Sequence, residues 1–537
     1  YNTVDMSHWR MYNDYFPPYK AAIEAGAQSV MASFNIVDGI PATGNRWLLT
    51  EVLRDQWGFD GFVVTDYTGI YEMIAHGMGD FQTVGALALK AGVDMDMVSD
   101  AFVGTLAKSL KEGKVTEDEI NTACRRILEA KYRLGLFKDP YKYCDVKRPA
   151  KEVFTAENRA EARKIARESF VLLKNEGNAL PLKKSGKIAL IGPLANTRAN
   201  MPGTWSVAAV SEKYSTLLEG FQAAVGDKAE ILYAKGSNLM YDAAREKDAT
   251  MFGREIRDNR TDAEMLKEAL EVAAKADVIV AALGESSEMS GESSSRTNLE
   301  MPDAQRDLLK ALLATGKPVV LFSGRPTVLT WEEENVPAIL NVWFGGSETA
   351  DAVPDVVFGD YSPSGKLTST FPRTVGQLPM SYNYYNTGRP QKQWFSKFTT
   401  SYLDCPNEPL YPFGYGLSYT KFQYSDFALS ADSMKEDGTI TASVKVSNVG
   451  NYDADEIVQL YIRDMVGSVV RPVQELKGFE RISLKKGECK TVTFTINADL
   501  LKFYNSKLEY VCEPGEFQVM VGPNSRDVEI KSFNLAK

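Results

Sequence analysis

Short apolar runs alternate with amphipathic stretches over residues 1–135. Within the stretch 61–67, four apolar or β-branched residues lead straight into Asp66. This run predicts a strand buried on both faces, with the carboxylate where the strand leaves its sheet. The same reasoning predicts strands at 28–34 and 93–97, and helices at 17–25, 46–56, 81–90 and 116–134. Alternating strands and helices predict a parallel sheet. Only three strands are predicted, so we expect part of a TIM-like (β/α)8 barrel or a smaller sheet, because a full barrel takes about 250 residues.

The alternation resumes after an irregular stretch at 136–156, which has the composition of a linker. Residues 157–385 are predicted to form an open, doubly wound α/β domain. Its strands are expected at 187–191, 230–233, 278–283, 319–322 and 339–343. Amphipathic helices are expected between them, for instance at 262–276 and 303–314.

The hydrophobic period changes to two near the C-terminus. Residues 386–425 are aromatic, contain Pro and Gly, and show little periodicity, which is typical of a connecting segment. From about 426 to 537, apolar residues alternate with polar ones in about seven short runs, for example at 440–446 and 458–462. This pattern predicts an immunoglobulin-like β-sandwich.

Composition excludes several classes of partner and of catalytic site. The formal net charge of −10 argues against nucleic acid and anionic membranes, which need clustered Lys and Arg. No apolar run is long enough to cross a bilayer, and the first residues lack the pattern of a signal peptide. The five Cys form no CxxC pair, so we expect no metal, and their disulfide state stays open. With His8 and His76 alone available as imidazole bases, carboxylate chemistry is the better candidate.

Two segments carry candidate carboxylates. Asp66 follows a predicted strand, although an Asp at such a place often only caps a turn. The loop after the strand at 278–283 holds Glu285, Glu288 and Glu292 among small residues. Open α/β folds bind ligands at such strand ends, but a solvated acidic loop has the same composition.

At this point the chain resembles glycoside hydrolase family 3, of the β-glucosidase type. The resemblance covers essentially the whole chain, through several long motifs in the family's order. The matching stretches are 61–66, 91–95, 290–292 with Arg296, 363–367, 411–419 and 471–479.

The resemblance implies a TIM-like barrel, an α/β sandwich and a fibronectin type III-like domain, in that order. It implies that Asp66 is the nucleophile and Glu292 the general acid/base of a retaining β-glycosidase that needs no cofactor. In this family the active site lies between the first two domains, with one carboxylate from each. Among the three glutamates of the loop, only the motif selects Glu292 over Glu285 and Glu288.

The resemblance also implies four substrate-binding residues. Met31 and Phe34 match positions that line the sugar subsite, where the second residue is often Tyr. Tyr67 follows the nucleophile, where Trp is frequent, and Trp205 matches a Trp beside the leaving group. Each of the four can equally be a packing residue, since aromatic and Met side chains are common in cores.

The chain departs from the family pattern at its start. The family normally continues upstream of Tyr1 with the first barrel strands, a sugar-binding Asp and Arg, and a Lys-His pair. We therefore expect this segment on another chain, removed, or outside the numbered sequence. A homodimer is left open, and the family suggests a periplasmic or secreted bacterial protein.

Several functions remain open from the sequence. The leading hypothesis is an exo-acting β-glucosidase that acts on oligosaccharides or glycosides. β-Xylosidase, arabinofuranosidase and β-N-acetylhexosaminidase activities are alternatives within the class. A non-catalytic carbohydrate-binding fragment is the alternative outside it. A nucleotide-binding module ranks last, because no Gly-rich phosphate loop follows a strand.

Overall fold

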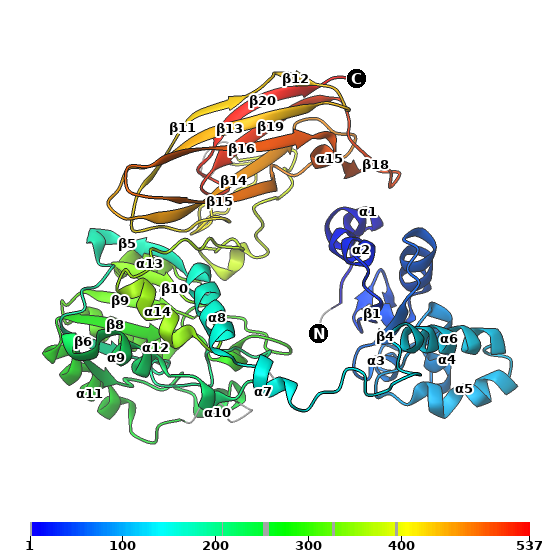
Figure 1. Ribbon diagram of the computed structural model, residues 1–537, viewed down its shortest axis with the longest axis horizontal. Coiled ribbons are helices and arrows are strands. Elements are labelled where there is room, and N and C mark those ends of the chain that lie inside the picture. Colours follow the sequence, from blue (N-terminus) through cyan, green and yellow to red (C-terminus); the bar gives the residue numbers. More distant parts are fainter. Residues whose placement is uncertain (1–2, 207, 251–256, 325–327, 392–395) are drawn as a thin grey trace. The chain divides into compact units, whose positions relative to one another are not determined.

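The computed structural model describes residues 3–206, 208–250, 257–324, 328–391 and 396–537 (Figure 1). They form two compact units. Unit 1 consists of residues 1–151 with 503–511, and unit 2 of residues 152–502 with 512–537. The sequence-based segment boundaries at 135, 156, 385 and 425 remain predictions.

Unit 2 is built around a six-stranded sheet with the strand order β5-β10-β9-β8-β6-β7. All neighbouring pairs are parallel except β5 with β10. The strands are β5 (Val171–Asn175), β6 (Gly186–Ile191), β7 (Ala229–Ala234), β8 (Val278–Leu283), β9 (Val319–Ser323) and β10 (Ala338–Asn341). Five of them were predicted. We missed β5, since the short apolar run at 170–173 directly follows a helix and has no period of its own.

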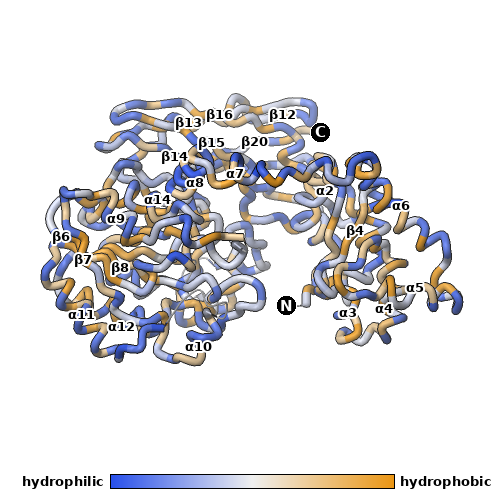
Figure 2. Tube along the Cα trace, turned by 60° about the horizontal axis from the view of Figure 1, so that its bottom comes forward, coloured by the Kyte–Doolittle hydropathy of each residue, from blue (hydrophilic) through white to orange (hydrophobic). Residues whose placement is uncertain are grey.

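Helices cover both faces of this sheet. One face packs on α11 and α12, and the other on α8, α9 and α14. Figure 2 shows β6, β7 and β8 in predominantly hydrophobic colours. Most of β6 and β8 is buried, as expected for strands covered on both sides, whereas the edge strand β7 is mostly half-buried. The helices of this region are α8 (Ala156–Ser169), α9 (Leu217–Val225), α10 (Ala243–Asp248), α11 (Asp262–Lys275), α12 (Asp303–Leu313), α13 (Thr330–Asn335) and α14 (Thr349–Val357).

The C-terminal part of unit 2 is a β-sandwich, as the period of two predicted. Alternate residues of β13, Ile440 to Val446, are buried against alternate residues of β14, Val458 to Ile462. One sheet contains β11 (Phe422–Leu429), β13 (Thr439–Asn448) and β16 (Cys489–Asn497). The other contains β12 (Ser433–Met434), β20 (Glu529–Leu535), β19 (Gly515–Gly522), β14 (Ala454–Asp464) and β15 (Glu475–Leu484).

Unit 1 contains a two-stranded parallel sheet, β1 (Ser29–Ala32) with β4 (Phe62–Thr65). The prediction that β4 is buried on both faces is wrong within this unit. Val63 and Thr65 are buried, whereas Phe62 and Val64 are half-buried, because the helical core covers one face. The further strands are β2 (Ile36–Val37) and β3 (Ile40–Pro41).

The predicted third strand at 93–97 contributes one bridge, between Met95 and Val64. The amides of Asp94 and Met95 both donate to the carbonyl of Val63, which interrupts a regular ladder. The predicted helices of unit 1 are present, and Thr116 and Glu119 form the expected capping box. The main helices are α2 (Phe16–Glu24), the π-helical η3 (Trp47–Gln56), α3 (Gly69–Glu72), α4 (Phe81–Ala91), α5 (Ala101–Lys111) and α6 (Glu117–Arg133), with the short α1 (His8–Arg10), η1 (Met11–Tyr15), η2 (Ala42–Gly44) and α7 (Arg148–Glu152).

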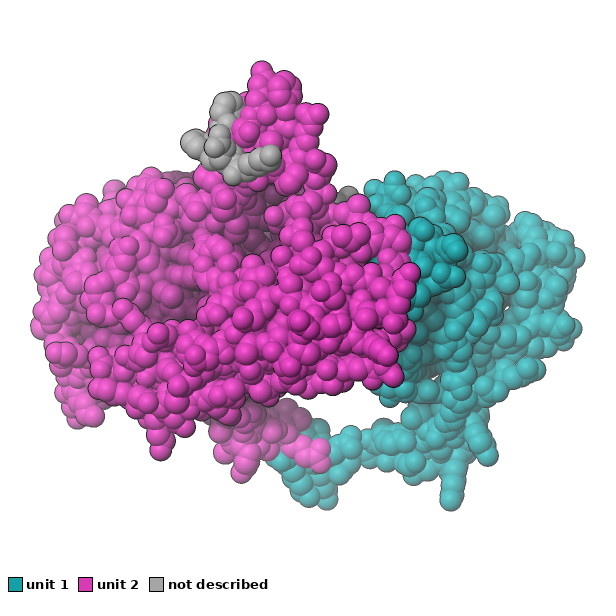
Figure 3. Space-filling model, turned by 90° about the horizontal axis from the view of Figure 1, so that it is seen from above, with its two compact units in different colours: residues 1–151, 503–511 teal, residues 152–502, 512–537 magenta. Residues whose placement is uncertain are grey.

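A hairpin from near the end of the chain belongs to unit 1. It follows α15 (Ala498–Leu501) and comprises β17 (Phe503–Tyr504) and β18 (Tyr510–Val511); Figure 3 colours it with the N-terminal residues. The carbonyl of Tyr504 accepts the indole N–H of Trp9 at 2.6 Å, and its amide donates to Asn13 at 3.0 Å. Its ring lies 5.1 Å from that of Tyr12. No sequence pattern predicted this contact.

Asp94 is the charged centre of unit 1. Its buried carboxylate accepts from Arg54 at 2.6 Å, from Arg126 at 2.9 Å and from the amide of Val63 at 2.8 Å. Arg54 also donates to the carbonyl of Gly61 at 3.0 Å. Burial lowers the pKa of Arg54, and the Asp94 carboxylate opposes that shift. The cluster therefore fixes the beginning of β4.

Replacing Asp94 by Ala leaves a buried guanidinium without its counter-ion, which typically costs about 3–5 kcal/mol. We expect hydrogen exchange at residues 62–65 to accelerate accordingly, measured by mass spectrometry under native conditions. Asp60→Ala is the matched control, since Asp60 pairs with Arg133 at the surface. Unchanged exchange in Asp94→Ala would contradict the anchoring role.

Candidate active-site loops

The sheet of unit 2 has a topological switch point between β6 and β8. From β6 the chain moves outward to β7, and it then returns to the other side of β6 with β8 and continues to β9 and β10. β6 and β8 are parallel neighbours, so their carboxyl ends lie side by side. Open α/β sheets bind ligands in the crevice at such a point. The loops at 192–216 and 284–302 leave the sheet here.

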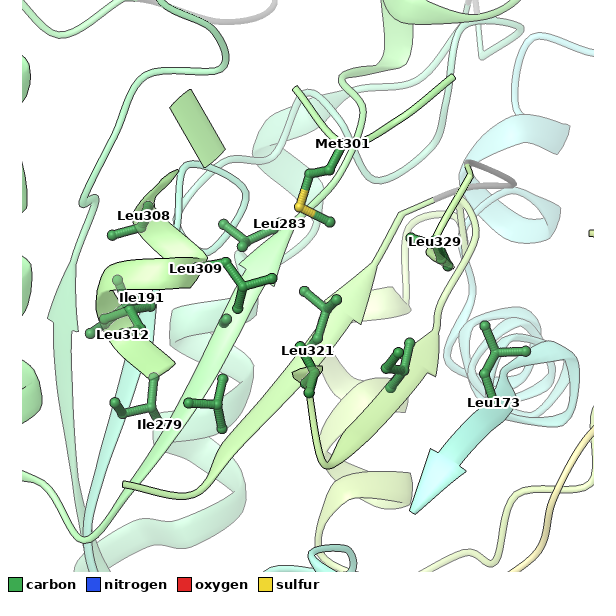
Figure 4. Packing of buried hydrophobic residues seen from close by; sticks show 14 of the residues in the cluster. Leu173, Ile191, Ile279, Leu283, Met301, Leu308, Leu309, Leu312, Leu321 and Leu329 are labelled. Carbon is green, nitrogen blue, oxygen red and sulfur yellow. The ribbon is translucent and has the colours of Figure 1, made fainter. Parts of the chain in front are cut away.

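The loop after β8 is fixed at its base. Gln305 of α12, which is fully buried, both accepts from the amide of Gly284 and donates to its carbonyl, each at 2.9 Å. Leu283, Leu309 and Met301 pack together beneath it (Figure 4). The loop therefore begins from a rigid part of the sheet.

Burial separates the three glutamates of this loop. Glu285 is buried and forms an ion pair with Arg296, which also donates to the carbonyl of Glu300 at 3.0 Å. Glu288 is buried as well, next to Ser287. Glu292 is exposed. Of the three carboxylates, that of Glu292 is therefore the one accessible to a ligand on unit 2.

The loop after β6 carries Trp205, whose side chain is 70% exposed. The residue before it, Thr204, donates to the carbonyl of Ser290 at 2.6 Å and also contacts that of Ser287. Asn200 accepts from the amide of Ser287 at 2.8 Å. The structure thus brings the segments of Trp205 and Glu292 together within unit 2.

Asp66 follows β4 in unit 1 and is half-buried. Its amide donates to the carbonyl of Ala32 at 3.0 Å, which ties it to the end of β1. One carboxylate oxygen accepts from the amide of Tyr67 at 2.6 Å. The preceding residue, Thr65, is buried and accepts from the amide of Met97 at 2.9 Å. Asp66 therefore stands at the carboxyl edge of its sheet, as predicted.

The other candidates of unit 1 surround this edge. Met31 and Tyr67 are 54% and 61% exposed, so neither is a core residue within unit 1. Phe34 is half-buried, and its carbonyl lies 3.2 Å from the His76 ring. His8 stacks on Trp47 and contacts Asp38, which gives it a structural environment.

Sequence reasoning missed the residues that hold these segments. Asn200, Thr204, Gln305 and Asp94 act through backbone groups distant in sequence, and no local pattern reports such pairs. The glycine at position 291, inside the glutamate motif, is a signal in the sequence, because glycine readily takes a positive φ; here it adopts φ +124°.

Two other properties concern the described residues as a whole. In those ranges, no group of His, Cys, Asp and Glu side chains is arranged to hold a metal ion. None of the described helices is both long and apolar enough to cross a membrane.

Comparison with known families matches most of the chain. Residues 1–130 match the glycosyl hydrolase family 3 N-terminal domain, and residues 170–419 match the glycosyl hydrolase family 3 C-terminal domain. Residues 456–525 match the fibronectin type III-like domain. The predicted barrel-like, α/β sandwich and fibronectin type III-like architecture is confirmed.

Individual relatives span the chain from end to end. A periplasmic β-glucosidase of Salmonella typhimurium is 49% identical over all of this chain and 71% of its own length. A β-xylosidase of Formosa agariphila is 38% identical over 99% of this chain and 72% of its own. The crystal structure of a Listeria innocua β-glucosidase with isofagomine superimposes with a TM-score of 0.90 and 37% identity, over all of this chain and 72% of that one. The chain therefore belongs to glycosyl hydrolase family 3.

Proposed function

We propose that this protein is an exo-acting, retaining β-glucosidase, with Asp66 as nucleophile and Glu292 as general acid/base. The observation that carries the proposal is the similarity to β-glucosidases over the whole of this chain, at 49% identity to the Salmonella typhimurium protein. Two features of the chain agree with it. Each carboxylate follows a strand at the carboxyl edge of its sheet, and Glu292 is exposed whereas Glu285 and Glu288 are buried.

The reaction consists of two displacements at one sugar carbon. Asp66, ionised, attacks the anomeric carbon while the bond to the leaving oxygen breaks, and Glu292 gives its proton to that oxygen. Glu292 then takes a proton from water, whose oxygen attacks the same carbon and releases Asp66. Two carboxyl groups about 5 Å apart suit this sequence, and no cofactor takes part.

Substrate contacts follow from exposed aromatic and apolar side chains. Tyr67 and Trp205 offer exposed ring faces on which a sugar can stack. Tyr67 follows the nucleophile in sequence, and Trp205 follows Thr204, which contacts the Glu292 loop. Met31 and Phe34 border the nucleophile strand and complete the proposed sugar subsite. Replacing one of these four side chains by a smaller one should weaken substrate binding more than it slows the bond-breaking step.

β-Xylosidase activity is the second candidate. It is favoured by the Formosa agariphila β-xylosidase, which matches nearly the whole chain at 38% identity. Xylose lacks the hydroxymethyl group of glucose, so the two activities differ in the shape of one subsite. The ratio of kcat/KM values for 4-nitrophenyl β-glucoside and β-xyloside decides between them.

A 2-deoxy-2-fluoro β-glucosyl fluoride should trap the first intermediate, because it slows release of the sugar more than its attachment. We expect one added sugar, mapped to Asp66 by peptide mass spectrometry. Asp66→Asn is the control and should gain none. An adduct on another carboxylate would overturn the assignment, and a non-catalytic binding protein would gain no adduct with glucosyl or xylosyl reagents.

Glu292→Ala should lose general acid and base catalysis, typically 10²–10⁴-fold in rate. Added azide needs no deprotonation, so it should displace Asp66 from the intermediate and form a β-glycosyl azide. The readout is the azide-dependent rate with 2,4-dinitrophenyl β-glucoside, and the product's configuration by NMR. Glu288→Gln serves as control and should show no azide dependence. Azide rescue of that variant instead would reassign the acid/base.

Trp205→Ala should lower kcat/KM for a disaccharide roughly 3–10-fold, through loss of a stacking face. Trp205→Phe retains a ring and should recover most of the loss. Tyr132→Ala removes an equally exposed ring from α6 and should leave the rate unchanged. Equal effects of Trp205→Ala and Tyr132→Ala would argue against a substrate contact.

A further inference from the structure

Thr204 joins the two loops that leave the switch point. Its hydroxyl donates to the carbonyl of Ser290 at 2.6 Å and reaches that of Ser287 as well. A hydroxyl carries one hydrogen, so the two carbonyls share it in a three-centre bond. Both belong to the loop of Glu292, whereas Thr204 directly precedes Trp205. One side chain therefore connects the two segments.

Gly291 shows how closely the loops fit. It adopts φ +124°, and a Cβ there would lie 2.7 Å from Cγ2 and 3.0 Å from Cβ of Thr204. A side chain at position 291 would therefore displace the threonine or the loop. The residue that follows is Glu292, so the backbone directly before the acid/base rests on the threonine side chain.

A second contact keeps the loops in register. Asn200, which is buried, accepts from the amide of Ser287 at 2.8 Å. Four residues after Asn200, Thr204 contacts the carbonyl of that same Ser287. The Trp205 loop is thus hydrogen-bonded to the Glu292 loop through one amide and two carbonyls.

We propose that Thr204 is a positioning residue that holds Glu292 in line with the leaving-group oxygen. It also links the position of Glu292 to that of the Trp205 ring. The inference rests on the proposed function, because it assigns to Thr204 the alignment of the proton donor. Loss of this alignment has a specific effect on the rates of different substrates. Misalignment of an acid slows departure of poor leaving groups, which need a proton, and spares good ones, which do not.

Thr204→Val keeps the shape of the side chain and removes the hydroxyl, and Thr204→Ser keeps the hydroxyl. The measurement is kcat/KM for a series of aryl β-glucosides, from 2,4-dinitrophenyl to phenyl, with the full-length protein. We expect Thr204→Val to lose about ten-fold on phenyl glucoside and less than about two-fold on the dinitrophenyl substrate. Thr204→Ser should stay within about two-fold throughout.

Gly291→Ala disturbs the same contact from the other loop and should show the same dependence on the leaving group. It also keeps the test decisive if Thr204→Val proves unstable. A uniform loss across the series, or no loss, in both variants would overturn the proposal. Glu292→Ala, measured in parallel, separates the two hypotheses. If its own loss does not depend on the leaving group, the proposed function fails; if it does, and the Thr204 and Gly291 variants show no such dependence, only the positioning role fails.

Discussion

Burial of the central sheet is the constraint on which unit 2 depends. Strands such as β8 are covered by helices on both faces, so charged groups on them would lie far from water. Polar chemistry is therefore confined to the loops at the strand ends. Because β6 and β8 are parallel neighbours at the switch point, their loops meet, and the exposed Glu292 and Trp205 both come from that place.

Unit 1 places a charged group in its interior. Its small sheet is covered fully on one face, and its stability relies on a buried carboxylate, Asp94, shared by two arginines and the backbone of β4. Removal of such a carboxylate is costly because its partners stay buried. The strand that ends at Asp66 is thus fixed at its beginning by charge and at its end by Thr65 and Ala32.

The fold could be predicted because burial leaves a period in the sequence. The strands around the switch point, the capping box at Thr116 and the alternation in the sandwich all follow from local patterns, and the family is confirmed. The sequence did not reveal β5, nor that the predicted strand at 93–97 forms only one bridge, since backbone pairing with distant residues decides both. The roles of Asp66 and Glu292 came from motifs, and they remain predictions. Thr204 and Asn200 left no periodic signal at all.

The hairpin at 503–511 has a consequence for biosynthesis. Trp9, Tyr12 and Asn13 all contact Tyr504, and Trp9 leaves the ribosome 495 residues before it. Chains elongate at about 5–20 residues per second, so residues 1–151 wait roughly 20–70 s for this partner. During translation, unit 1 presents the aromatic surface that the hairpin later covers, and a chain that stops short of residue 503 leaves that surface open for good.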